Sequence, residues 1–374
     1  MSDAIHEFRI SIPDADLDDL AHRLDEARWP ADLPGDDWSR GVPAGYLRDL
    51  ATYWRTGYDW RAHEATLNAF PQFVTEIDGQ RIHFLHVRSS RSDATPLFLT
   101  HGYPSSFVEF RRLIGMLIEP EEGPAFHVVA PSLPGYGFST PLSGPGWTMG
   151  RIAQAWAGLA RRLGYERYGV HGGDIGAGVS GMVATADPEH VIGMHVVTDP
   201  MTAASAATFI PGLADGLDPA DPVDRLALDR MEHFRTETSG YLRIQNSRPR
   251  TMGYGLNDSP LLQLAWIADS FHEWTDLPID RDDLLTNVSL YWFTGSGIGA
   301  AQGLYEQAHA HDWGEPPSVP QGYAVFGADA TMRKLMPVPV GVHWTEFERG
   351  GHFPALEAPE QVAADLRTFF GSIA

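Results

Sequence analysis

The sequence predicts an α/β protein with a mostly parallel sheet flanked by helices. Short apolar runs alternate with helical runs in the middle of the chain, which is typical of parallel strands joined by crossover helices. This alternation stops after Asp199-Pro200 and resumes at residues 322–327, and the sequence between reads as helices and loops. We therefore predict one sheet, interrupted by a helical cap over residues 201–318.

The N-terminal segment, residues 1–72, is predicted to be helical and to wrap around the core. Apolar residues recur at helical spacing over residues 14–28, and further helices are expected over 46–58 and 61–70. No strand alternation is evident in this segment. Its tryptophans are typical of packing anchors, namely Trp29, Trp38, Trp54 and Trp60.

The first part of the predicted core, residues 73–200, opens with a hairpin around the turn pair Asp78-Gly79. Buried parallel strands are expected over 96–100, 126–130, 167–171 and 192–198, with helices over 107–118 and 152–163. The second part, residues 319–374, adds strands over 322–327 and 342–347. A closing helix is expected from Pro359.

Composition narrows the classes of function. The 374-residue chain carries a formal net charge of −22, which argues against nucleic acid or an anionic membrane as a partner. It has no cysteine, so disulfides and thiolate metal sites are excluded. We expect no signal peptide, and no apolar run in the sequence reaches the length of a membrane helix. We expect a cytoplasmic protein that needs neither metal nor cofactor, and the sequence leaves a homo-oligomer open.

Asp174 stands at the most informative position of the chain. It follows a predicted strand and Gly172-Gly173, and it precedes Ile175, Gly176 and a predicted helix. This is the layout of a nucleophile elbow, in which a sharp turn exposes one reactive side chain above a sheet. The helix N-terminus behind it favours an ionised carboxylate. A carboxylate nucleophile forms an alkyl ester, so it suits attack on an activated sp³ carbon.

A dinucleotide site is the alternative interpretation of the same stretch. Gly176, Gly178 and Gly181 match the G-x-G-x-x-G pattern, and Asp199 lies at about the expected distance of 20 residues. However, the preceding strand is not the first of its series, and Asp174 would place negative charge against the pyrophosphate. We therefore prefer the elbow.

The turn His101-Gly102-Tyr103-Pro104 follows another apolar strand. The exposed backbone N–H of this turn, at Tyr103, and the N–H of Ile175 could together form an oxyanion hole beside Asp174. We expect His101 to orient this loop rather than to act as a catalyst.

His352 lies on a glycine-rich loop just after the last predicted strand and suits the general base. Its partner acid has two candidates. Asp329 follows the penultimate strand, and Asp199 follows an earlier one. The chain order of nucleophile, acid and histidine favours Asp329.

An Asp nucleophile with a His–Asp pair implies ester formation and then hydrolysis of that ester by water. A departing epoxide oxygen needs a proton, which a buried phenol can donate. The insert supplies such phenols (Tyr241, Tyr254, Tyr291 and Tyr305). A halide site would favour tryptophan after the nucleophile, where this chain has Ile175, so epoxide opening is preferred. Haloalkane dehalogenation and a non-catalytic ligand-binding role are the alternatives.

Over essentially its whole length the chain resembles the epoxide hydrolases of the microsomal and juvenile-hormone type. The segments that carry this resemblance are Ala69–Phe73, His101–Pro104, Pro131–Ser139, Gly172–Asp174, Ser239–Tyr241, Leu256–Pro260, Asp283–Val288 and Arg349–Phe353. Two departures are Ile175, where the family often has tryptophan, and Asp329, where vertebrate members often have glutamate. We expect no counterpart of the membrane anchor of the animal members.

The resemblance implies the α/β-hydrolase fold and an epoxide as the small-molecule substrate. It implies Asp174 as nucleophile, His352 as base and Asp329 as its acid, with Tyr241 and Tyr305 activating the epoxide oxygen. Aromatic residues of the cap suggest an apolar substrate. The residues expected to contact it are Pro104, Trp266, Trp292 and Phe353.

Overall fold

The computed structural model describes residues 4–31, 35, 37–311, 316–336 and 340–373. Its centre is a nine-stranded sheet in the order β1-β2-β3-β5-β4-β6-β7-β8-β9. The pairings from β5 to β9 are parallel, and those that join β1, β2, β3 and β5 are antiparallel. The predicted fold class is therefore confirmed.

The strands lie close to their predicted positions. They are β1 (His6–Phe8), β2 (Gln72–Ile77), β3 (Gln80–Val87), β4 (Thr95–Thr100), β5 (Phe126–Pro131), β6 (Tyr168–Gly172), β7 (Val191–Thr198), β8 (Gln321–Val325) and β9 (His343–Glu346). Only β1 was not predicted. It has three residues, two of them exposed, and therefore carries almost no pattern of alternation.

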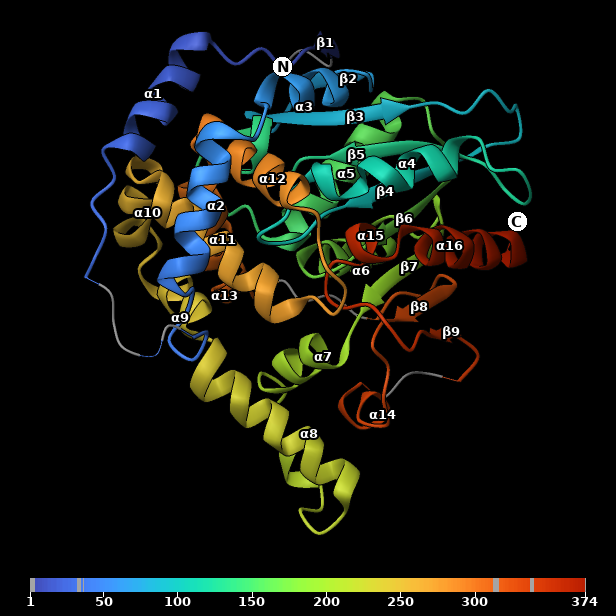
Figure 1. Ribbon diagram of the computed structural model, residues 1–374. Coiled ribbons are helices and arrows are strands. Elements are labelled where there is room, and N and C mark those ends of the chain that lie inside the picture. The colour runs from blue at the N-terminus through green and yellow to red at the C-terminus, as the bar shows by residue number, and fades with distance from the viewer. Residues whose placement is uncertain (1–3, 32–34, 36, 312–315, 337–339, 374) are drawn as a thin grey trace.

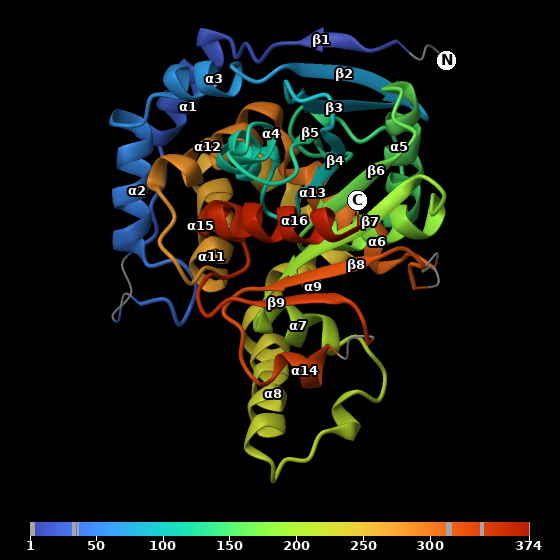
Figure 2. The same ribbon diagram turned by 90° about the vertical axis from the view of Figure 1, so that its right-hand side faces the viewer.

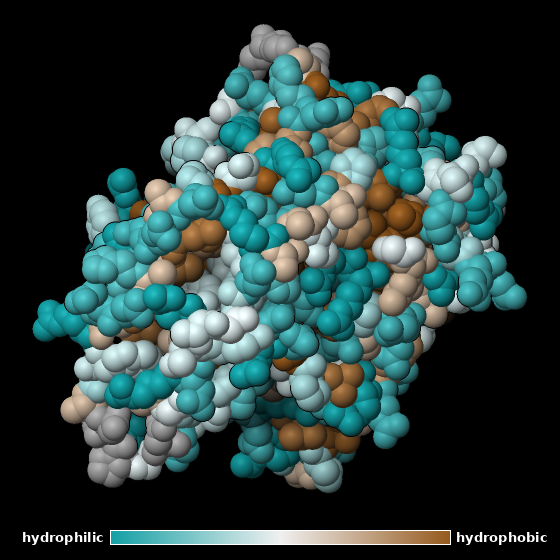
Figure 3. Space-filling view, turned by 45° about the horizontal axis from the view of Figure 1, so that its top comes forward, coloured by the Kyte–Doolittle hydropathy of each residue, from teal (hydrophilic) through white to brown (hydrophobic). Residues whose placement is uncertain are grey.

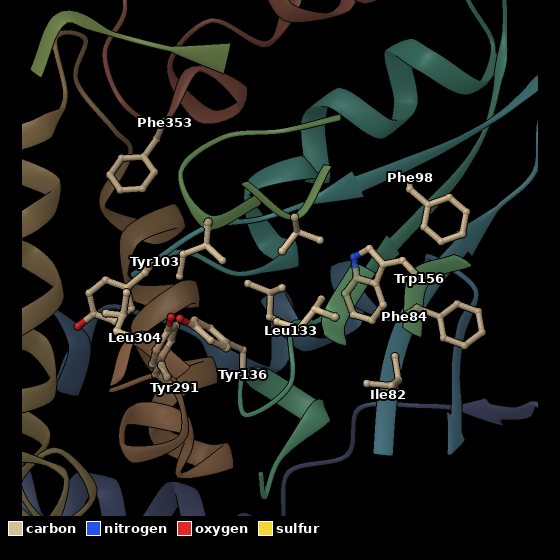
Figure 4. Packing of buried hydrophobic residues seen from close by; sticks show 14 of the residues in the cluster. Ile82, Phe84, Phe98, Tyr103, Leu133, Tyr136, Trp156, Tyr291, Leu304 and Phe353 are labelled. Atoms are coloured by element: carbon tan, nitrogen blue, oxygen red, sulfur yellow. The ribbon is translucent and has the colours of Figure 1, made fainter. Parts of the chain in front are cut away.

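Helices cover both faces of the sheet (Figures 1 and 2). On one face lie α5 (Met149–Arg162) and α6 (Ile175–Ala186), and on the other α4 (Arg111–Ile118), α15 (Pro354–Glu357) and α16 (Pro359–Ile373). Buried aromatic and aliphatic side chains fill the space between α5, the sheet and the cap, as Figure 4 shows around Trp156 and Tyr103. The sheet is thus buried on both sides, as parallel sheets require.

Between β7 and β8 the described chain is helical, and these helices form the cap. They are α7 (Pro200–Ala207), α8 (Pro222–His233), α9 (Gly240–Ser247), α10 (Pro249–Asp258), α11 (Pro260–Trp274), α12 (Arg281–Thr294) and α13 (Ser296–Ala308). Helix α8 projects from the body (Figures 1 and 2). It packs on α7 and on α14 (Met332–Leu335) through small apolar residues and methionines.

The N-terminal segment links the sheet to the cap. Strand β1 pairs with β2, while α1 (Asp14–Asp25) and α2 (Ala44–Thr56) lie against cap helices, and α3 (Trp60–Leu67) follows them. The Arg23 guanidinium is 3.0 Å from the Asp258 carboxylate, and the Trp54 indole donates to the Ser289 hydroxyl at 2.9 Å. The segment therefore contacts both parts of the molecule.

On the face in Figure 3, hydrophilic residues predominate and hydrophobic residues gather in separate patches. None of the described helices is both long and apolar enough to cross a membrane.

Buried histidines predict how stability depends on pH. Burial lowers the pKa of His83 to about 3 and that of His101 to about 4, so both rings are neutral in the folded protein. In the unfolded chain these rings titrate near pH 6.5. Below that pH the unfolded state binds protons that the folded state does not, so stability falls as pH drops from about 6.5 towards 4. Each such histidine lowers the free energy of unfolding by up to about 1.4 kcal/mol for each pH unit of this range.

Urea unfolding at pH 7 and pH 5 measures this effect. The free energy of unfolding should be lower at pH 5, and a His83→Gln variant should show a smaller difference between the two. The exposed His6→Gln is the control and should keep the parent's difference. Equal free energies at pH 7 and pH 5 in the parent protein would contradict the expectation.

Candidate active site

Asp174 stands between β6 and α6 with φ of 53° and ψ of −126°. Non-glycine residues rarely take a positive φ, and a strained backbone of this kind is typical of functional turns. Glycines make the turn possible. A Cβ on Gly176 would lie 1.9 Å from the Thr100 carbonyl oxygen, and one on Gly172 would lie 2.4 Å from the Gly176 backbone. The predicted elbow geometry is therefore present.

The loop after β4 packs directly on this carboxylate. The backbone N–H of Tyr103 donates to Asp174 Oδ1 at 2.9 Å, and a Cβ on Gly102 would lie 2.5 Å from the Asp174 Cβ. Nδ1 of His101 donates to the Gly102 carbonyl at 3.0 Å, and its Nε2 accepts the Leu133 N–H at 3.2 Å. His101 is thus buried, neutral and engaged in bracing the loop.

His352 lies on the other side of the carboxylate. Its Nε2 is 3.6 Å from Asp174 Oδ2, while its Nδ1 is 2.7 Å from Thr202 Oγ1 and 3.4 Å from Asp199 Oδ2. The Thr202 hydroxyl also donates to Asp199 Oδ2, so the three groups are mutually hydrogen-bonded. Asp199 caps α7 by accepting the backbone N–H groups of Met201 and Thr202. Sequence analysis did not single out Thr202.

These contacts determine the protonation of His352 and Asp199. Burial alone would lower the pKa of His352, but the hydrogen bond with Asp199 and the charge of Asp174 outweigh burial and raise it. Burial alone would raise the pKa of Asp199, but its hydrogen bonds with His352 and Thr202 lower it. Asp199 is therefore a carboxylate that favours a proton on Nδ1 of His352, which leaves Nε2 free to accept one.

The predicted pairing of Asp329 with His352 needs correction. The Asp329 carboxylate is 2.6 Å from Arg230 on α8 and accepts the Thr331 N–H at 2.9 Å. Among the described residues, the carboxylate at Nδ1 of His352 is instead that of Asp199, the rival candidate. Arg230 belongs to a cap helix about 100 residues before Asp329, and the strand order does not reveal this long-range ion pair.

The two cap tyrosines occupy different surroundings. The Tyr241 ring stacks on Tyr103, with centroids 6.0 Å apart and planes inclined by 7°, and it lines a cavity together with Asp174. The Tyr305 ring stacks on His309 at 4.0 Å and is not among the residues that line the cavities described below. The role expected of Tyr305 therefore stays a prediction.

Of the four residues expected to contact substrate, Phe353 lines the smaller of the two cavities beside Asp174 and not the cap-side one. Trp266 donates its indole N–H to the Tyr103 hydroxyl at 2.5 Å. Trp292 lies beneath the Arg23 guanidinium, and the Pro104 carbonyl accepts a hydrogen bond from Asn287. Trp266 thus contacts the loop after β4, Trp292 contacts the N-terminal segment, and Pro104 contacts the cap helix α12. For all four residues, contact with substrate stays a prediction.

Asp174 and His352 separate two cavities. The cavity on the cap side has a volume of about 50 Å³, and its lining includes Phe234, Tyr241 and Trp274. The cavity on the core side has a volume of about 10 Å³ and is lined by core residues, including Glu109. Sequence analysis missed Glu109, although a lone acid within the apolar run Phe107–Phe110 is a signal of a buried carboxyl group.

The fold and this site define an α/β hydrolase with a carboxylate at the nucleophile position. The described residues contain no cluster of histidine, aspartate and glutamate placed to hold a metal ion. Residues 97–365 match the alpha/beta hydrolase family, and residues 5–110 match the epoxide hydrolase N terminus family.

Relatives narrow the class further. The chain is 41% identical to a Stigmatella aurantiaca protein assigned to the epoxide hydrolases by its name, over 98% of this chain and 84% of that one. It is 32% identical to epoxide hydrolase 1 of Sus scrofa, over 99% and 89%. The solved structure of Aspergillus niger epoxide hydrolase matches with a TM-score of 0.83 and 32% identity, over 99% of this chain and 97% of that one. The chain therefore belongs to the epoxide hydrolase family.

The elbow glycines give a direct test of the site's construction. Gly176→Ala places a Cβ against the Thr100 carbonyl, so we expect the free energy of unfolding to fall by at least about 2 kcal/mol. Gly115→Ala, in α4, meets no atom within 4 Å and should raise it by roughly 0.5–1 kcal/mol. Denaturant unfolding of both variants measures the contrast. A Gly176→Ala variant as stable as the parent would show that the turn tolerates a side chain.

Proposed function

We propose that the protein converts an apolar epoxide and water into a vicinal diol through an ester on Asp174. One observation carries the proposal: a carboxylate on a strained turn has a backbone N–H donor at one oxygen and a histidine beside the other. The aromatic lining of the cap-side cavity favours an apolar substrate. Family membership supports the same reaction.

In the first step Asp174 Oδ2 attacks a carbon of the epoxide. Oδ1 is held by the Tyr103 N–H, so Oδ2 is the oxygen left to react. The C–O bond of the ring breaks, and its electron pair moves to the epoxide oxygen, which takes a proton from Tyr241. Burial raises the pKa of Tyr241, so its hydroxyl is protonated before the reaction. We retain Tyr305 as a second proposed donor.

In the second step Nε2 of His352 takes a proton from water as the water oxygen attacks Cγ of the ester. The charge that develops on Oδ1 is stabilised by the Tyr103 N–H and, we propose, by the N–H of Ile175. The bond between Cγ and Oδ2 then breaks, and the departing oxygen takes the proton held by His352, which releases the diol. Asp199 and Thr202 orient the imidazole and stabilise its protonated form. The second proton of the water, left on the Asp174 carboxyl group, returns to the tyrosinate, so the carboxylate and the tyrosine are both restored and no proton is consumed overall.

Single-turnover hydrolysis of styrene oxide in ¹⁸O-water tests the reaction. The ester mechanism leaves the first-turnover diol unlabelled and places ¹⁸O in the peptide that contains Asp174. Mass spectrometry of the diol and of the protein digest measures both. Diol that carries ¹⁸O from the first turnover, with an unlabelled peptide, would instead show direct attack by water.

The choice of acid can be tested with two isosteric variants. Asp199→Asn should slow ester hydrolysis on the order of 10²- to 10⁴-fold, because the imidazole loses the carboxylate that stabilises its protonated form. Asp329→Asn should change this rate only a few-fold and reduce the free energy of unfolding by about 1 kcal/mol, because it removes a partly exposed ion pair.

The accumulated ester is measured as a mass increase of the intact protein after incubation with epoxide. His352→Gln provides the reference for complete trapping. Ester that accumulates in Asp329→Asn but not in Asp199→Asn would reverse the assignment.

A further inference from the structure

The cavity on the core side of Asp174 is the size of one water molecule. Its volume, about 10 Å³, is close to the minimum that one water molecule needs. An epoxide does not fit into this space. Asp174 and His352 line this cavity as well as the cap-side one. A small molecule on the cap side and a water on the core side would therefore meet the same carboxyl group from different directions.

Besides Asp174 and His171, two buried polar side chains line the small cavity. Nε2 of His352 is buried, and within the described part of the chain it has no hydrogen-bond partner. Glu109 lies on the 3₁₀-helix Phe107–Phe110 with 8% of its surface exposed, and Ser105 hydrogen-bonds its carboxyl group. Leaving a buried nitrogen unsatisfied is costly, and a water within a polar cavity removes that cost.

We propose that Glu109 is a catalytic residue of ester hydrolysis, and that its carboxyl group and Nε2 of His352 together hold the attacking water behind Asp174. This role rests on the two-step reaction proposed above. Glu109 fixes the water on the core side of Cγ, and His352 removes its proton. With two fixed partners the water is oriented before attack, which lowers the entropic part of the barrier.

The charge of Asp174 couples Glu109 to the reaction cycle. Burial is the main cause that raises the pKa of Glu109, to about 8, and the negative charge of Asp174 adds to it. Ester formation removes that negative charge. The pKa of Glu109 then falls, so Glu109 ionises more readily when the ester is present. An ionised Glu109 accepts a hydrogen bond from the water and stabilises the protonated His352 that forms.

Of the other titratable groups nearby, Asp365 is charged, whereas His195, His171 and Tyr291 are neutral. Asp365 is a carboxylate with a pKa of about 2, so Nε2 of His195 donates to it. Nδ1 of His195 is then an acceptor, and the Nδ1–H of His171 donates a hydrogen bond to it at 3.0 Å. Burial keeps the pKa of His171, which lines the cavity, well below its usual value. Burial likewise raises the pKa of Tyr291, so its hydroxyl stays protonated.

The test separates the two chemical steps in the full-length protein. Styrene oxide is mixed with excess enzyme between pH 6 and pH 9, and the ester is followed by intact-protein mass. Glu109→Gln should leave ester formation within about twofold of the parent. The same variant should slow ester hydrolysis by about 10- to 100-fold. The rate of ester hydrolysis should also lose the dependence on pH that arises from the ionisation of Glu109.

Ala355→Val supplies an independent variant because it fills the same cavity without changing a charge. It should slow ester hydrolysis at least about tenfold while keeping the parent's pH dependence. Glu121→Gln, an exposed glutamate, controls for the loss of one negative charge and should match the parent in both steps.

Ester hydrolysis at the parent rate in Glu109→Gln would overturn the role of Glu109 and leave the two-step reaction intact. Equal slowing of both steps, with a lower unfolding midpoint, would mark Glu109 as a structural residue and would also overturn it. If the parent itself forms no ester, the proposed reaction fails, and this role fails with it.

Discussion

The close approach of three backbone segments at the end of β6 is the constraint on which the site depends. Gly176 touches the last residue of β4, and Gly102 touches the side chain of Asp174, so the elbow, the loop after β4 and the start of α6 are in direct contact. A larger residue at either glycine would separate them. The position of the carboxylate is therefore set by the packing of the backbone and does not depend on contacts with other side chains.

Tyr103 joins this rigid centre to the cap. Its backbone N–H holds Asp174, and its hydroxyl accepts hydrogen bonds from Gln245 and Trp266, which belong to the cap helices α9 and α11. Tyr241 stacks on the same ring. The group that is expected to donate a proton to the epoxide oxygen is thus positioned by the residue that holds the nucleophile. The cap and the elbow form one connected arrangement across the interface between the two parts.

Much of this arrangement could be predicted from the sequence because it follows from local patterns. Asp174 and the loop before Pro104 follow apolar strands, and the carboxyl ends of parallel strands meet at one edge of the sheet. The alternation of strands and helices likewise predicts the fold class. The division of the chain at residues 72, 200 and 318 stays a prediction.

What could not be predicted depends on contacts between distant residues. The pairing of Asp329 with Arg230 leaves Asp199 as the partner of His352, and no local pattern distinguishes one strand end from the other. The side-chain contacts of Trp292 also depend on the packing of the N-terminal segment. The order of nucleophile, acid and histidine along the chain does not show which of the two carboxylates forms an ion pair with a cap helix.

The N-terminal segment has a mechanical consequence. One end of it is a strand of the sheet, and its helices are bonded to the cap through Arg23, Tyr53 and Trp54. The cap cannot swing away as a hinged lid without breaking these bonds. Helix α8, which projects at the end of the molecule away from α1 (Figure 1), lies outside these contacts. A ligand that reaches the carboxylate while these bonds stay intact must therefore do so without a domain motion.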